Sequence, residues 1–406
     1  MSEDYMGQML SMVIKNKDFA GQFLRTLSKT YYKCADIGEC FTTIGRIGDG
    51  DFDAWYNEWS QTAERVRLLA EESLRDGHKV SAREGFLRAC EYYRQSFCFL
   101  RENLDDPRIL TAADNLRDCF RQAIKLFDTP VRKVEIPYEN TTLPGYLYHA
   151  DDSSTPRPTL VMPGGYDGIV EELYAYSASA AILRGYNCLT FDGPGQGHAL
   201  IRQRLYMRHD FENVLSPVLD WLFEQHEVDK DKVILMGRSF GGYLAPRGAC
   251  GEKRLAALVC DPGQMDIAGV LQEKLPPEVL KMWKTNYASG VNDFFGGIFE
   301  KNPSMRIFFL SRMRVHGVSS VYDFLNEFSR YTFKDKVSTI TCPTLVCDNP
   351  TDTVANRGNT LYEALNYKKD IIVFQASDGA GAHCEAGATG LFEQMVFDWI
   401  DKIVKN

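Results

Sequence analysis

The fold of this chain is decided by one stretch, Val233-Ile234-Leu235-Met236-Gly237-Arg238-Ser239-Phe240-Gly241-Gly242, in which an apolar run leads into the pattern G-x-S-x-G. A serine hydroxyl is a weak nucleophile, so it must stand on a tight turn within reach of a histidine, and flanking glycines permit that crowded turn. The helical segment that follows brings the positive end of its dipole near developing negative charge. This context predicts that Ser239 is a nucleophile, with a plain strand–turn–helix connection as the alternative.

Two further residues follow Ser239 in the order serine, acid, histidine that such a turn requires. Asp352 and His383 each come shortly after a late apolar run. Both therefore fall at the carboxyl end of an expected strand, the edge at which open α/β sheets gather their sites. We expect His383 to accept the proton of Ser239 and Asp352 to orient the imidazole. Asp348 and Asp261 are the alternative acids.

Acyl transfer also needs donors for the oxyanion. We expect one to be the backbone N–H of Phe240 and the other the backbone N–H of Tyr166, in the loop Pro163-Gly164-Gly165-Tyr166-Asp167-Gly168. An ordinary glycine turn is the alternative for this loop.

Candidates for the substrate pocket are the charged residues near these turns, namely Asp167, Glu171, Glu172 and Arg238. For Glu171 and Glu172, the alternative is a place at the start of a helix, where carboxylates favour the helix dipole. For Arg238, the alternative to substrate binding is an exposed or salt-bridged side chain.

The chain has two parts that differ in their prolines. Of 16 prolines, only Pro107 precedes Pro130. A proline-poor region is free to be helical, and apolar residues there recur three and four positions apart. We therefore expect residues 1–130 to form an all-helical domain, with its aromatic stripes as packing core; the alternative is that one stripe covers an active site. Two helices are expected to begin at the capping boxes Ser81/Glu84 and Thr111/Asp114.

From Val131 onward, short apolar runs alternate with helix-length stretches. Such alternation predicts an α/β fold: a mostly parallel eight-stranded sheet, covered by helices on both faces, with the first two strands as an antiparallel hairpin at one edge. We expect residues 131–406 to form this domain. The expected strands are Val131–Tyr138, Leu143–Tyr148, Thr159–Met162, Cys188–Phe191, Val233–Met236, Leu255–Val259, Thr344–Cys347 and Ile371–Phe374.

One interval of this domain, about residues 266–336, holds no obvious strand. Residues 294–333 contain ten aromatics in forty positions, twice the 12% of the whole chain. An insertion of this length is typical of a functional lid. Two interpretations of its aromatic residues stay open: they line a pocket for an apolar or aromatic substrate, or they pack the lid against the helical domain.

Composition excludes several classes of protein. The chain of 406 residues is 44% hydrophobic and 25% charged, which suits a packed core rather than disorder. A net charge of −9 without a long basic run disfavours nucleic-acid binding. No apolar stretch reaches the roughly 18 residues of a membrane-spanning helix, the N-terminus is acidic where a signal peptide is basic, and 11 scattered cysteines fit reduced thiols. We expect a cytoplasmic protein without a metal or other cofactor, since no metal-binding motif occurs.

With these residues identified, the chain resembles the α/β-hydrolase superfamily over about residues 131–406. It is more specifically similar to the group with an N-terminal helical domain, which includes bacterial dihydroxypseudooxynicotine hydrolase and fungal polyketide-cluster hydrolases of the fusarin and pigment polyketide-shortening types. The related peptidases instead carry a β-propeller, which counts against a peptidase. The stretches that carry the resemblance are Gly164-Gly165-Tyr166-Asp167 with Glu171-Glu172, Phe191-Asp192-Gly193-Pro194-Gly195-Gln196-Gly197, Gly237–Gly242 with Ala245-Pro246-Arg247, Gly379–Gly387, and in the helical part Trp55–Trp59 and Ser81–Tyr93.

The resemblance implies a triad of Ser239, Asp352 and His383 between the two domains, a homodimer, no cofactor, and cleavage of a carbon–carbon or ester bond. Carbon–carbon cleavage is chemically reasonable, because attack on a 1,3-dicarbonyl compound releases an enolate that the remaining carbonyl stabilises. The expected substrate is a polyketide-like ketone, ester or lactone. Two alternatives stay open: a cyclase or transesterase in which a substrate group replaces water, and a non-catalytic binding protein on the same fold.

Overall fold

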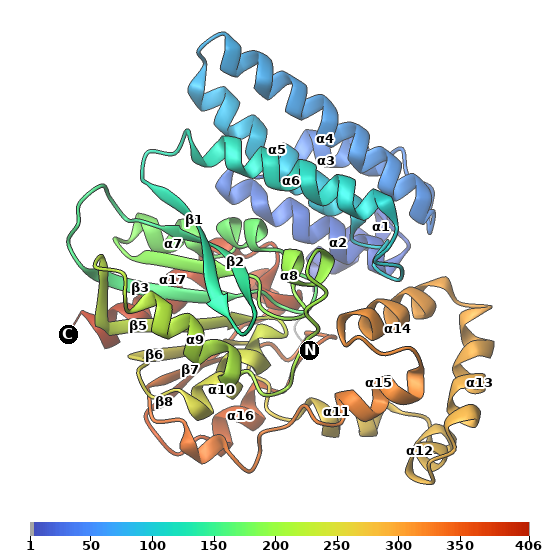
Figure 1. Cartoon of the computed structure of the whole chain (residues 1–406). Coiled ribbons are helices and arrows are strands. Elements are labelled where there is room, and N and C mark those ends of the chain that lie inside the picture. Colours follow the sequence, from blue (N-terminus) through green and yellow to red (C-terminus); the bar gives the residue numbers. More distant parts are fainter. Residues whose placement is uncertain (1–3, 406) are drawn as a thin grey trace.

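The computed structural model describes residues 4–405, and its first part consists of helices (Figure 1). A short 3₁₀ turn, Ser28–Tyr32, interrupts them. Trp55 and Trp59 are fully buried between these helices, and the indole N–H of Trp55 donates to the Gln95 carbonyl at 2.8 Å. The stripe that contains both tryptophans is thus helix-packing core. The helices are α1 Tyr5–Val13, α2 Lys17–Leu27, α3 Ile37–Ile44, α4 Phe52–Arg75, α5 Lys79–Phe97 and α6 Pro107–Ile124.

The predicted starts of two of these helices were wrong. Helix α5 begins at Lys79, so Ser81 lies inside it rather than capping it. Helix α6 begins at Pro107, and the Asp106 carboxylate accepts a hydrogen bond from the Arg108 N–H at 2.9 Å. Aspartate at the cap followed by proline in the first turn is a stronger start signal than a capping box further along. Thr111 is consequently an interior residue whose hydroxyl donates to the Pro107 carbonyl.

The second part is built on an eight-stranded sheet with the order β1-β2-β4-β3-β5-β6-β7-β8. The hairpin β1–β2 is antiparallel at one edge, β2 pairs antiparallel with β4, and the other neighbours are parallel. Each of the eight predicted runs overlaps a strand, so the predicted fold class is confirmed. The strands are β1 Val131–Tyr138, β2 Thr141–Tyr148, β3 Arg157–Pro163, β4 Asn187–Phe191, β5 Val228–Arg238, β6 Ala257–Asp261, β7 Thr344–Asp348 and β8 Lys369–Val373.

Side chains of the central strands alternate between two apolar layers. In β5, Ile234 and Met236 pack into one cluster with α7 and α17, whereas Val233 and Leu235 pack into a second cluster with α9, α10 and α16. Because both faces are covered, these strands are apolar throughout. The expected helix over 171–183 is divided into a 3₁₀ turn, Val170–Ala175, and α7. The helices are α7 Ala178–Leu183, α8 Gly197–Ile201, α9 Glu212–Leu222, α10 Gly241–Gly251, α16 Gly358–Ala364 and α17 Thr389–Val404.

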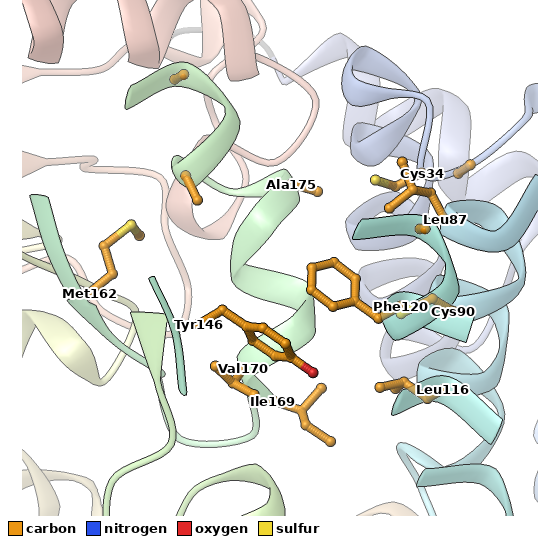
Figure 2. Close-up of a cluster of buried hydrophobic side chains, with 14 of the residues drawn as sticks. Cys34, Leu87, Cys90, Leu116, Phe120, Tyr146, Met162, Ile169, Val170 and Ala175 are labelled. Atoms are coloured by element: carbon orange, nitrogen blue, oxygen red, sulfur yellow. The ribbon is translucent and has the colours of Figure 1, made fainter. Parts of the chain in front are cut away.

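The helical part and the sheet share one apolar core (Figure 2). Phe120 of α6 meets Tyr146 of β2 edge to face, with ring centroids 4.9 Å apart. Leu116 from α6 and Ile169 and Val170 from the segment after β3 lie in the same cluster. Since burial of apolar area contributes about 25 cal/mol per Å², this contact holds the two parts in a fixed relation.

The interval after β6 forms a helical insertion, here called the lid, which Figure 1 shows as a lobe beside the sheet. An isolated bridge between Asp266 and Thr332 joins the two ends of the lid. The lid has an apolar cluster of its own that contains Phe295, Phe309 and Phe324. Within residues 4–405, no helix has the length and apolar character needed to span a bilayer. The lid helices are α11 Ile267–Lys274, α12 Pro277–Lys284, α13 Ala288–Phe299, α14 Pro303–Val315 and α15 Val321–Phe328.

Candidate active site

Ser239 lies on a sharp turn between β5 and α10, with a left-handed φ of 58°. The turn is held by two hydrogen bonds: the Ser239 N–H donates to the Asp261 carbonyl at 2.7 Å, and the Gly242 N–H donates to the Ser239 carbonyl at 2.8 Å. Gly237 is needed before the turn, because a Cβ at this position would lie 1.9 Å from the Gly241 carbonyl oxygen. The glycines of the motif therefore allow strand and helix to approach closely enough to project the serine.

The three predicted triad residues lie together, although up to 144 positions separate them in the sequence. His383 Nε2 is 2.8 Å from Ser239 Oγ, and His383 Nδ1 is 2.6 Å from Asp352 Oδ2. The other carboxylate oxygen of Asp352 accepts hydrogen bonds from the N–H groups of Val354 and Ala355 at 2.7 and 3.2 Å. The buried carboxylate is thus fixed by backbone donors with one oxygen free for the imidazole.

The electrostatic surroundings of His383 favour its protonated form. Burial alone would lower the pKa of the imidazole, but the neighbouring Cys384 and the hydrogen bond that the imidazole donates to Asp352 more than offset this effect and hold the pKa well above 6.5. Cys384 Sγ lies 3.5 Å from His383 Nε2. An imidazole that binds a proton more tightly than usual is a strong base once it is deprotonated.

The alternative acids have other partners. Asp348 accepts hydrogen bonds from the N–H groups of Gly358 at 2.9 Å and Asn359 at 3.4 Å, at the start of α16. Asp261 accepts a hydrogen bond from Arg238 Nε at 2.7 Å. Of the three candidate acids, Asp352 is the one whose carboxylate is hydrogen-bonded to His383.

The loop after β3 lies against the nucleophile. A Cβ on Gly165 would be 3.1 Å from Ser239 Cβ and 3.5 Å from Ser239 Oγ. Gln196 supports this loop, since its amide nitrogen donates to the Gly164 and Gly165 carbonyls at 2.5 and 3.2 Å. Gln196 was not among the predicted site residues, and α8 begins directly after it, at Gly197.

The two residues that carry the predicted oxyanion donors are in contact. Phe240 follows the nucleophile, and its ring meets the Tyr166 ring edge to face with centroids 4.9 Å apart. Within residues 4–405, the backbone N–H groups of Phe240 and Tyr166 donate no hydrogen bond and so remain available. Their role as oxyanion donors stays a prediction.

Replacing Gly165 by alanine is expected to slow acylation by about 10²- to 10³-fold, because the added methyl must displace either the Ser239 side chain or the loop that carries Tyr166. The matched control is Gly168→Ala, where the Cβ would meet its nearest neighbour, the Gly165 nitrogen, at an ordinary 3.5 Å. Rates of active-site phosphonylation compare the two variants. Equal rates would contradict the placement of this loop at the reacting oxygen.

Two predicted pocket residues, Asp167 and Glu172, take part in ion pairs with the helical part. Arg25 of α2 binds both, with Nη1 2.7 Å from Asp167 Oδ2 and Nη2 2.6 Å from Glu172 Oε2. Lys29 joins Glu172 to Glu91 of α5. Although burial of Glu172 would raise its pKa, the neighbouring cations hold the pKa values of the Asp167 and Glu172 carboxyls well below their usual range. Glu172 therefore links the two parts of the protein, whereas the Asp167 side chain remains 41% exposed.

The other two predicted pocket residues are also held inside the protein. Glu171 accepts a hydrogen bond from the Tyr146 hydroxyl at 3.0 Å and contacts His198 Nε2 at 3.1 Å. Arg238 binds Asp261, and its Nη2 donates to the Cys384 carbonyl at 2.5 Å. The salt-bridged alternative thus describes Arg238, which ties the nucleophile strand to the histidine loop. Substrate binding by Glu171, Glu172 or Arg238 has no support from these contacts.

Aromatic residues of the lid reach the nucleophile turn. Phe328 stacks on Phe240 with centroids 6.1 Å apart, and Tyr331 lies 5.7 Å from the same ring. The His316 ring contacts the Tyr166 ring, and His316 Nδ1 shares a hydrogen bond of 3.2 Å with the Tyr331 hydroxyl. Burial lowers the pKa of His316 to about 3, so this imidazole is neutral.

Within residues 4–405, no group of three or more histidine, cysteine or acidic residues is arranged to hold a metal ion.

Comparison with known proteins identifies the family. The family model described as esterase FrsA-like matches residues 41–276. The chain is 35% identical over 405 residues to the hydrolase LUC6 of a Fusarium species, covering 95% of this chain and 96% of the relative. It is 33% identical over 401 residues to the 20-hydroxy-prefusarin hydrolase FUS2 of Gibberella moniliformis, and the match covers 94% of this chain and 96% of that relative.

The fold is also shared with a solved structure. The 2,6-dihydroxy-pseudo-oxynicotine hydrolase superposes with a TM-score of 0.74 at 20% identity, covering 93% of this chain and 95% of the other. The resemblance stated from the sequence is thus confirmed over both the helical part and the sheet. The chain belongs to the FrsA-like esterase family of α/β-hydrolases.

Proposed function

We propose that this protein is a serine hydrolase that cleaves a carbon–carbon or ester bond of a polyketide-like metabolite. The observation that carries the proposal is the hydrogen-bonded series Ser239–His383–Asp352, with donor–acceptor distances of 2.8 and 2.6 Å. Relatives that align over nearly the whole chain bear the names of hydrolases, and one acts on 20-hydroxy-prefusarin. The family, the geometry of the three residues and the names of the relatives thus all support a hydrolytic reaction.

The geometry supports a two-step mechanism. Ser239 Oγ attacks the substrate carbonyl carbon while His383 Nε2 takes the hydroxyl proton, and the N–H groups of Phe240 and Tyr166 stabilise the oxyanion. The bond to the leaving group then breaks, and the imidazolium returns the proton to the leaving enolate or alkoxide. Water, deprotonated by His383, attacks the acyl-enzyme and releases an acid and free Ser239. Asp352 holds the imidazole and stabilises its charged form throughout.

The lid favours an apolar or aromatic acyl group. Phe328 and Tyr331 pack on Phe240, next to the reactive serine, so an aromatic substrate entering here would meet aromatic surfaces. The lid also has an aromatic cluster made of lid residues alone, so this cluster does not support packing of the lid against the helical domain. A homodimer and a cytoplasmic location belong to the same proposal; sedimentation of the purified protein and localisation of a tagged chain test them.

Fluorophosphonate labelling tests the mechanism. We expect the folded wild-type protein to be phosphonylated at Ser239, as shown by peptide mass mapping. Incubation with metabolites of the source organism in ¹⁸O-water should yield an acid that carries one labelled oxygen. A product of unchanged mass would identify the alternative cyclase or transesterase, and a folded protein that never labels would leave the binding-protein alternative.

A further inference from the structure

Two arginines beside the active site have no carboxylate partner. Arg101, in the connection between α5 and α6, is only 7% exposed, and its Nη2 contacts the Tyr166 carbonyl at 3.4 Å. Arg312 of α14 lies with its guanidinium carbon 5.3 Å from the Tyr166 ring centroid. Its Nη1 donates to the Phe308 carbonyl of its own helix at 3.0 Å. Within residues 4–405, neither guanidinium forms an ion pair.

The surrounding charges do not compensate these two cations. Three cations and three carboxylates of the neighbouring cluster pair with one another, namely Arg25, Lys29 and Arg94 with Asp167, Glu172 and Glu91. That cluster is therefore neutral. Burial lowers the pKa of both Arg101 and Arg312, and the nearby Asp167 only partly opposes this effect. A buried cation without an ion-pair partner, such as Arg101, is costly, and such groups are typical of binding sites. Arg312 is half-buried and also has no carboxylate partner.

Both guanidinium groups contact Tyr166, in the loop that carries a predicted oxyanion donor. A small cavity between the helical part and the sheet is lined by Arg101, Asp167 and Gly168, among others. Tyr166, which both arginines contact, directly follows Gly165, the residue packed against the Ser239 side chain. The helical part and the lid thus each supply one positive charge next to the loop expected to bind the oxyanion.

We propose that Arg101 and Arg312 bind an anionic oxygen group of the substrate while Ser239 attacks a carbonyl of the same molecule. The group is a carboxylate or the ionised enol of a 1,3-dicarbonyl unit, since both spread one negative charge over two oxygens that match a guanidinium. This inference rests on the proposed hydrolase function and adds the charge of its substrate.

Three series of p-nitrophenyl esters of increasing chain length test the proposal. One series ends in a carboxylate, one in an acidic cyclic 1,3-diketone, and one in a neutral methyl ester. We expect the wild type to favour one anionic series over the neutral esters by about 10- to 100-fold in kcat/KM, the range of charge-assisted hydrogen bonds. The favoured ending distinguishes the two sources of charge. Arg101→Gln and Arg312→Gln should remove this preference, whereas Arg306→Gln, on the same helix, should retain it.

The outcomes separate this inference from the hydrolase proposal. Fluorophosphonate labelling at the wild-type rate in Arg101→Gln would show an intact nucleophile. Hydrolysis of all three series without preference for charge, or a preference that survives both substitutions, would overturn the anion site and leave the hydrolase standing. Failure of every ester and of labelling would instead reject the hydrolase.

The thermal stability of Arg101→Met gives an independent test. Removal of an unpaired buried charge should leave the melting temperature unchanged or raise it, as expected for a residue that serves a ligand. A lower melting temperature together with slower phosphonylation would assign Arg101 a structural role and reject its role in binding.

Discussion

Replacing either Ser239 or His383 by alanine is expected to lower turnover by about 10⁴- to 10⁶-fold. In the proposed mechanism, the Ser239 hydroxyl forms the bond to the acyl group, and His383 Nε2, 2.8 Å away, takes its proton. Without the imidazole, the hydroxyl at neutral pH is almost entirely protonated and unreactive. Hydrolysis of a p-nitrophenyl ester measures the loss of turnover in each variant, and fluorophosphonate labelling measures the reactivity of the hydroxyl. Ser239→Ala should abolish labelling altogether.

The two substitutions are expected to be strongly non-additive. Nucleophile and base act as one unit, so the variant lacking both should be about as slow as either single variant. Ser311→Ala and His226→Ala serve as controls, because Ser311 bonds within its own lid helix and the His226 side chain is 77% exposed. Both controls should retain wild-type rates. Residual turnover in Ser239→Ala that disappears on thiol alkylation would instead identify Cys384, 3.5 Å from His383 Nε2, as the nucleophile.

The sheet and the triad could be predicted from the sequence because the fold imposes local patterns on them. Strands such as β5 and β7 are covered on both faces and therefore read as continuous apolar runs. Ser239, Asp352 and His383 each follow the end of a strand, so the parallel topology brings them to one edge. Local pattern and topology were enough to place these three residues.

Contacts between the parts of the molecule have no such local pattern. The pair Arg25–Asp167 joins residues 142 positions apart, and nothing near either residue indicates its partner. Glu172 was therefore assigned to the pocket although a buried ion pair holds it. Arg101 and Arg312 were missed for the same reason, since an arginine without an ion-pair partner can be identified only after its surroundings are known. The helix start at Pro107 was misplaced because Asp106 and Pro107 form a competing start signal a few residues before the capping box. The start at Lys79 has no side-chain cap, so no local signal marks it.

The substitution Asp352→Asn is expected to lower turnover by about 10⁴-fold while keeping the shape of the site. Asparagine can still accept from the Val354 and Ala355 N–H groups, which hold one oxygen of the present carboxylate. Its amide N–H₂ would then face His383 Nδ1, which would have to accept rather than donate. The proton would move to Nε2, the atom that must be unprotonated to receive the hydrogen of Ser239. Asp348→Asn, at an acid bonded to the start of α16, should retain activity.

The pH dependence gives the same variant a second, independent readout. His383 acts as a base only when deprotonated, and its raised pKa means that the wild-type rate increases with pH through a midpoint above 6.5. Because the hydrogen bond to Asp352 helps to raise that pKa, its loss should move the midpoint of Asp352→Asn to lower pH, even as the maximal rate falls. Phosphonylation rates between pH 5 and 9 measure both effects. A variant with the wild-type midpoint would show that Asp352 does not interact with the base, and a large loss in Asp348→Asn would transfer the role of the acid to Asp348.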